Sequence, residues 1–177
     1  MVNTQTVDDT IAAFKQRASD ARSIVHEMSD WHEVSALALE LAGSGTIAVS
    51  SPVTEAWPGL LESIGERATP PGQDHAVTAT ASVGIVRGAL GIAETGSVLL
   101  VEEHSSDRAV SMLPPVVVQL LDRADIRPTL DALLERVFAA PPTFASLTTG
   151  PSRTADIERA LTIGVHGPHD VHVVILG

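Results

Sequence analysis

The sequence predicts a single α/β domain in which helices cover both faces of a mostly parallel β-sheet. Its 177 residues fit one domain better than two. Strand-like and helix-like segments alternate along the second half, which is typical of this fold class. The segments VVVQLL (116–121) and VHVVIL (171–176) are apolar at nearly every position, as expected of strands that helices cover on both sides. We expect residues 1–45 to form a helical lead-in and residues 46–177 to form the α/β core of the same domain.

The N-terminal half is expected to contain three helices and one short strand. Apolar residues recur at steps of three and four across 11–28, which predicts one helical face. A second helix over 34–41 is closed by Gly43, a residue that readily adopts the left-handed conformation at a helix end. A strand over 46–50 and a helix over 60–67 complete this half.

The second half is expected to alternate between strands and helices. Residues 77–86 have an extended pattern, and 87–94 fit a short helix. The remaining segments are strands over 97–101, 116–121, 144–148 and 171–176, and helices over 130–138 and 154–163.

Composition and charge exclude several classes of function. Twenty-two acidic residues against 11 basic ones give a net charge of −11, so the surface would repel the phosphates of nucleic acid. The acidic, polar start and the lack of an apolar run of about 18 residues argue against a secretory signal and a membrane span. The chain has no cysteine, so it has none of the thiolates that ordinarily hold iron–sulfur clusters.

The segment GPSRTADIE (150–158) is the first candidate ligand site. It follows a predicted strand and would open a helix, so free amides at the helix start would face an anion. Ser152 or Thr154 would cap that helix, and Arg153 would add a two-pronged contact to a carboxylate or phosphate. An ordinary capped helix, with Arg153 paired to Asp156, explains the same residues.

Glu94 is a second candidate, because it precedes an apolar strand. Partial burial there would favour a role as base or nucleophile. The alternative is a helix that ends at Gly96 and leaves Glu94 in solvent. Further along, Glu102, Glu103 and Asp107 are expected to form a solvated rim.

Three histidines with the spacing HxxHxxH stand near the end of the sequence, at positions 166, 169 and 172. Three imidazoles can bind a transition metal. Gly167 and Pro168 break any helix there, so we expect no metal site. We expect His166 to be a loop histidine that hydrogen-bonds to the protein or completes the pocket for the anion.

Three segments, considered together, are specific enough to indicate a protein family. They are AETGSVLL (93–100), SMLPPVVVQLL (111–121) and GPSRTADIERALTIGVHGPHDVHVVIL (150–176). The chain resembles the LUD domain, the family of lactate utilization protein C, with good coverage over 83–177. This resemblance implies a Rossmann-like three-layer sandwich similar to the NagB/RpiA/CoA-transferase superfamily. The positions of this chain that match the motifs of the family are Glu94, Thr95, Gly96, Arg108, Pro114, Gly150, Ser152, Arg153, Thr154, Asp156, His166 and Gly167.

The resemblance also implies a cytoplasmic role in the oxidation of L-lactate to pyruvate, alongside two iron–sulfur partner proteins. No intrinsic cofactor is expected, because any cluster would belong to those partners. Two classes of function stay open. One is a subunit that binds a small anionic ligand, with Gly150, Ser152 and Arg153 at its centre. The other is a stand-alone enzyme of the transferase or isomerase type, with Glu94 as nucleophile or base and His166 beside it.

Overall fold

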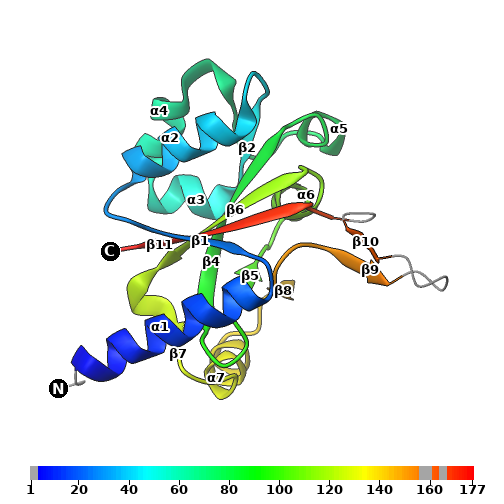
Figure 1. Cartoon of the computed structure of the whole chain (residues 1–177). Coiled ribbons are helices and arrows are strands. Elements are labelled where there is room, and N and C mark those ends of the chain that lie inside the picture. The colour runs from blue at the N-terminus through cyan, green and yellow to red at the C-terminus, as the bar shows by residue number, and fades with distance from the viewer. Residues whose placement is uncertain (1–3, 156–160, 164–166) are drawn as a thin grey trace.

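The structure is a computed structural model that describes residues 4–155, 161–163 and 167–177 (Figure 1). Its centre is a run of parallel strands in the order β1-β11-β6-β4-β2-β3. These strands are β1 (Ile24–Met28), β2 (Ile47–Val49), β3 (Ala68–Thr69), β4 (Val83–Ile92), β6 (Val116–Asp122) and β11 (Asp170–Leu176). The predicted α/β class with a mostly parallel sheet is confirmed.

A second part of the sheet is built on the C-terminal half of β4. Strand β5 (Ser97–Val101) pairs antiparallel with β4, and β8 (Ala145–Thr148) pairs antiparallel with β5. The short strand β7 (Ile126–Arg127) lies parallel to the end of β4. All five strands expected in the sheet, from the one at 46–50 to the one at 171–176, are therefore present in it.

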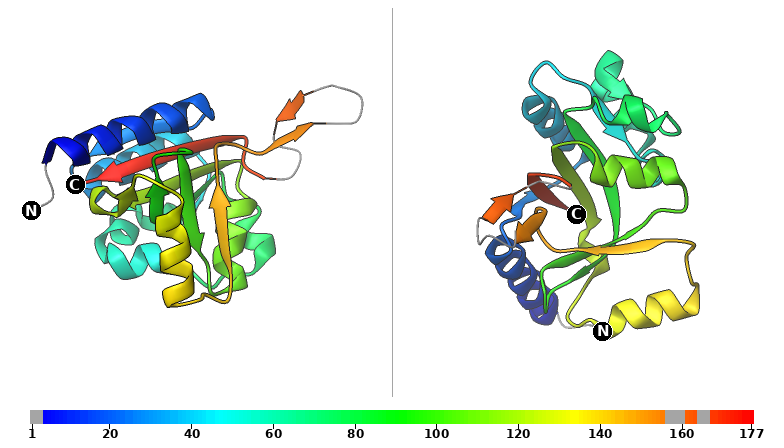
Figure 2. Two further views of the ribbon diagram at one scale, coloured as in Figure 1. Left: turned by 90° about the horizontal axis from the view of Figure 1, so that it is seen from below. Right: turned by 90° about the vertical axis from the view of Figure 1, so that its right-hand side faces the viewer.

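Helices cover both faces of the parallel strands (Figure 2). Helices α2 (Trp31–Ala42), α3 (Ser51–Ala56) and α4 (Pro58–Ile64) bury Val34, Val53 and Leu60 against one face. Helices α1 (Thr4–Asp20) and α6 (Ser105–Met112) bury Phe14 and Val110 against the other. The remaining short elements are α5 (His75–Thr78), α7 (Asp131–Ala139), η1 (Gly65–Arg67) and η2 (Arg123–Asp125). No helix in the ranges that the structure describes is long and apolar enough to cross a membrane.

The predicted helix over 11–28 is wrong in part, and the predicted helix over 87–94 is wrong. The helix expected over 11–28 ends at Asp20, and Arg22 turns the backbone with a positive φ of 71°. Residues Ile24–Met28 then form β1, which pairs with β11 along its whole length. The helix expected over 87–94 is instead the second half of β4 and the turn that follows it. Main-chain pairing with β6 and β5 overrides the local helical pattern there.

The helix expected over 154–163 is also wrong. Residues Arg153–Ala155 form β9 and Leu161–Ile163 form β10, and the two pair antiparallel. This two-stranded ribbon projects from the body of the protein at the end of the sheet remote from the C-terminus (Figures 1 and 2). The chain at Ser152 therefore enters a strand, and the helix amides that were to face an anion are not formed at this position.

Phe14 anchors α1 to the sheet and provides a test of this packing. It is fully buried, and its ring lies over Gly91 of β4. We expect Phe14→Ala to lower the free energy of unfolding by about 3–5 kcal/mol, because it leaves a cavity beneath α1. Val7→Ala on the exposed side of the same helix should change it by less than about 0.5 kcal/mol. Urea unfolding measures both, and equal effects would contradict the packing.

A pair of stacked histidines links β1 to β11. His26 Nε2 and His172 Nδ1 lie 2.9 Å apart, with the rings 8° from parallel. Burial lowers the pKa of both side chains, and for His172 the neighbouring His26 lowers the pKa further while Asp170 raises it. The folded protein therefore holds these rings in the neutral form more strongly than the unfolded chain does.

This pair predicts a pH dependence of stability. The unfolded chain takes up protons near pH 6.5, where the folded protein still resists them. The free energy of unfolding should thus be at its plateau above about pH 6.5 and fall as the pH drops toward the lowered pKa values. In urea titrations, His172→Gln should reduce the decrease in the free energy of unfolding with falling pH. His75→Gln, which changes an exposed histidine, should not alter this decrease. An unchanged slope in His172→Gln would refute the assignment.

Candidate functional site

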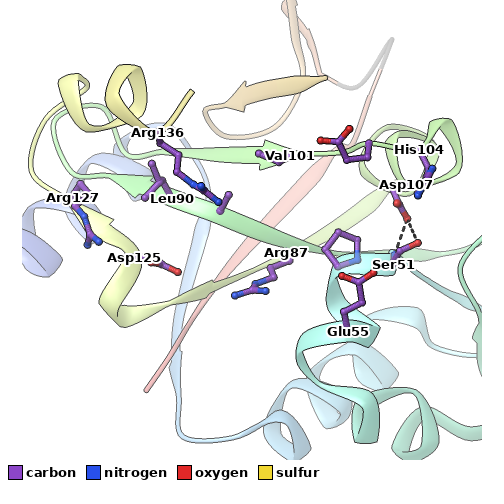
Figure 3. Close-up of a pocket in the computed structure, with 13 residues that line it drawn as sticks. Ser51, Glu55, Arg87, Leu90, Val101, His104, Asp107, Asp125, Arg127 and Arg136 are labelled. Carbon is purple, nitrogen blue, oxygen red and sulfur yellow. Dashed lines mark hydrogen bonds between the residues drawn. The ribbon is translucent and has the colours of Figure 1, made fainter. Parts of the chain in front are cut away.

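A cleft of about 540 Å³ opens where the parallel strands end (Figure 3). Ser51 follows β2, Arg87 lies in β4 beside the end of β6, and Asp125 follows β6. In open α/β sheets, ligands bind at this carboxyl edge. The antiparallel extension closes the other side with Val101 of β5.

Three arginines reach this cleft from β4, β7 and α7 (Figure 3). Arg87 pairs with Asp122 at 3.2 Å and lies 5.3 Å from the centre of the Trp57 ring. The guanidinium of Arg127 donates to main-chain carbonyls of η2 and β7. The side chain of Arg136 is exposed and forms no ion pair or hydrogen bond with any residue in the described ranges. One cation at the cleft is thus available to an anion.

The opposite end of the cleft carries hydroxyl and carboxyl groups (Figure 3). Asp107 is only 2% exposed, and its Oδ1 accepts hydrogen bonds from the Ser51 amide at 2.7 Å and the Ser51 hydroxyl at 3.0 Å. Glu55 and His104 line the same end. Arg127 and Arg136 thus lie at one end of the cleft with Asp125, whereas Ser51, Asp107 and His104 lie at the other, with Arg87 between them (Figure 3).

A second cavity, of about 310 Å³, lies under the β5–β8 part of the sheet. It is lined by Glu102 at the end of β5, by Gln119 of β6 and by Thr148 of β8, and by the turns that hold Gly150 and Gly167. Glu102 is 4% exposed, and burial raises the pKa of its carboxyl. No group of three histidine or acidic side chains that could hold a metal occurs within the described parts of the chain.

The structure brings some of the predicted site residues together at this second cavity. Gly150 and Ser152 line it with Gly167, and the Ser152 amide donates to the carbonyl of Pro168 at 3.0 Å. The loops at 150–152 and 167–168, whose meeting the sequence left open, therefore lie against each other. Arg153 and Thr154 lie in β9, and their side chains are outside the description, as are Asp156 and His166 altogether. Their binding roles stay predictions.

Other predicted residues lie elsewhere. Glu94 is exposed in the turn after β4, where its Oε2 accepts from the amide of Leu130 at 3.1 Å, at the start of α7. Thr95 accepts from the Ser97 hydroxyl at 2.7 Å. Arg108 of α6 is half-buried, with its guanidinium 4.8 Å from the centre of the Phe144 ring. Glu94 lines neither cavity.

Sequence reasoning missed the most buried acidic groups. Glu102 and Asp107 were expected in a solvated rim, and both are buried, whereas Glu103 is exposed as expected. The available signal was the place of Glu102 directly after the apolar strand at 97–101. Arg127 and Arg136 offered no such signal, because the strand and helix that carry them meet the cleft only in the folded chain.

Comparison with known proteins identifies the family. Residues 72–176 match the LUD domain. Over 127 residues the chain is 31% identical to lactate utilization protein C of Bacillus subtilis. The aligned region covers 68% of this chain and 53% of that protein. Over 98 residues it is 36% identical to the protein of the same name from Macrococcus caseolyticus, covering 52% and 42%. The chain spans about half the length of these curated relatives.

A solved structure shares the fold along almost the whole chain. It is the crystal structure of a DUF162 family protein from Deinococcus radiodurans, with a TM-score of 0.71. The likeness covers 97% of this chain and 98% of that one, at 23% sequence identity. With a family match over more than half of its residues, this chain belongs to the LUD domain family.

Proposed function

We propose that this chain takes part in lactate utilization by binding a small carboxylate anion at the arginine end of the cleft. Its relatives in Bacillus subtilis and Macrococcus caseolyticus are named for lactate utilization. The observation that carries the proposal is Arg136, an exposed guanidinium at the cleft with no partner among the described side chains. A guanidinium of this kind binds a carboxylate through two parallel hydrogen bonds.

The other end of the cleft offers hydrogen-bonding groups. Ser51 and Asp107 hold each other there, and His104 adds a ring nitrogen that can donate or accept. These groups are available to polar atoms in the part of the cleft remote from Arg136.

We further propose that electron transfer takes place on iron–sulfur partner proteins. This chain contributes no cysteine for a cluster. The role that remains for it is to hold the anion while a partner accepts the electrons. In this proposal the chain is the ligand-binding subunit of a lactate-oxidising assembly.

Binding of L-lactate tests the assigned site. We expect Arg136→Gln to weaken lactate binding roughly 10- to 100-fold, because the lost charge-assisted hydrogen bonds are worth about 1.5–3 kcal/mol. Isothermal titration calorimetry measures the affinity. Arg17→Gln is the matched control, since Arg17 also stands exposed in the last turn of a helix but lies on α1. Equal affinity in wild type and Arg136→Gln would refute the site.

Recovery of partners from the native host tests the assembly. We expect the tagged chain to co-purify with proteins that contain iron and acid-labile sulfide, measured by metal analysis and by their visible absorption. The purified chain alone should not oxidise L-lactate. Lactate oxidation by the isolated chain, or recovery without any iron-containing partner, would contradict the proposed division of labour.

A further inference from the structure

Glu102 is a buried carboxyl group that faces a cavity away from the arginine cleft. It stands at the end of β5 and is 4% exposed. Its Oε1 has no hydrogen-bond partner among the residues that the structure describes. The cavity beside it is about 310 Å³, which is room enough for a small organic molecule.

The charge of this carboxylate has no close counter-charge. The Ser111 and Ser146 hydroxyls help to lower the pKa of the carboxyl group, but both side chains are neutral. Arg108 forms no ion pair with it within 4 Å, because its guanidinium lies over the Phe144 ring instead. Burial raises the pKa of Glu102, Asp107 raises it further, and Arg108 lowers it. Buried charges in proteins are normally paired, and this carboxylate forms no ion pair with a cation among the described residues.

The neighbouring polar groups offer acceptors to a ligand more than donors. The amide nitrogen of Gln119 donates to the Thr148 hydroxyl at 2.8 Å, and that hydroxyl donates to the carbonyl of Val98 at 3.1 Å. Gln119 Oε1 accepts no hydrogen bond from the described residues. The rest of the wall includes the apolar side chains of Met112, Phe144 and Val171.

We propose that this cavity is a second ligand site, which takes a small organic cation with an apolar body and a protonated amine. The ammonium would donate to Oε1 of Glu102 and supply the missing counter-charge. The apolar body would lie against Phe144 and Val171. A carboxylate ligand would meet the Glu102 charge and be excluded, and no arginine lines this cavity to attract it.

Benzylamine is the probe, because it joins an aromatic ring to an ammonium group. In ¹H–¹⁵N correlation spectra we expect it to shift amides of β5, β8 and the turn at Gly150. Glu102→Gln keeps the shape but removes the charge, and should weaken benzylamine binding at least tenfold. Glu40→Gln, on an exposed glutamate of α2 across the sheet, is the matched control and should bind as wild type.

Charge and pH distinguish this site from non-specific binding. Benzoate should cause no shifts at this cavity, and benzyl alcohol should bind at least tenfold more weakly than benzylamine. Affinity for benzylamine should rise from about pH 5 to about pH 8, since Glu102 becomes charged as the pH passes its raised pKa while an alkylammonium stays protonated.

Two outcomes would overturn the proposal. One is equal benzylamine binding by wild type and Glu102→Gln, and the other is binding of benzoate at the same amides. If Glu102→Gln does not fold, Ser146→Leu fills the cavity without changing its charge and should abolish the shifts. Persistent shifts in Ser146→Leu would overturn the proposal equally. Neither result bears on lactate binding at Arg136, so the two sites fail or succeed separately.

Discussion

The antiparallel pairing of β5 with the far half of β4 is the interaction on which both cavities depend. One half of β4 belongs to the parallel sheet through β6, while the other half holds β5 and, beyond it, β8. Successive residues of an extended chain point to opposite faces. Val101 and Glu103 therefore line the arginine cleft, and Glu102 between them lines the second cavity. A single hairpin thus supplies walls to two separate cavities.

Two glycines of the family motifs are explained by the backbone. Gly96 and Gly150 both have positive φ, and both turns press against the end of α1. A Cβ at Gly96 would lie 2.2 Å from the amide nitrogen of Ala18, and one at Gly150 would lie 2.0 Å from the carbonyl oxygen of Ala21. Hydroxyls of Ser97 and Thr149, 2.7 Å apart, join the two turns. These glycines let α1 close over the β5–β8 extension, so their positions reflect packing as much as binding.

The sequence predicted the sheet well because its strands are buried on both faces. Runs such as 116–121 and 171–176 are apolar at nearly every position, as expected of strands that are covered on both faces. The helices predicted at 87–94 and 154–163 failed for a common reason. Each segment has a local pattern that allows a helix, but its described main chain pairs with another strand. Pairing of that kind leaves little trace in the periodicity of a single segment.

The candidate site residues were likewise hard to predict from the sequence, because contacts between distant segments place them. Spacing along the chain suggested Glu94, which the folded chain uses to bind the amide of Leu130 at the start of α7. Spacing gave no reason to join Arg87, Arg127 and Arg136, which three separate elements bring to one cleft. Glu102 follows an apolar strand, and its carboxyl group was therefore expected in solvent. The β8 strand and α6 cover it with Ser146 and Ser111, so a group that would end a strand in solvent instead becomes a buried charge with an unpartnered oxygen.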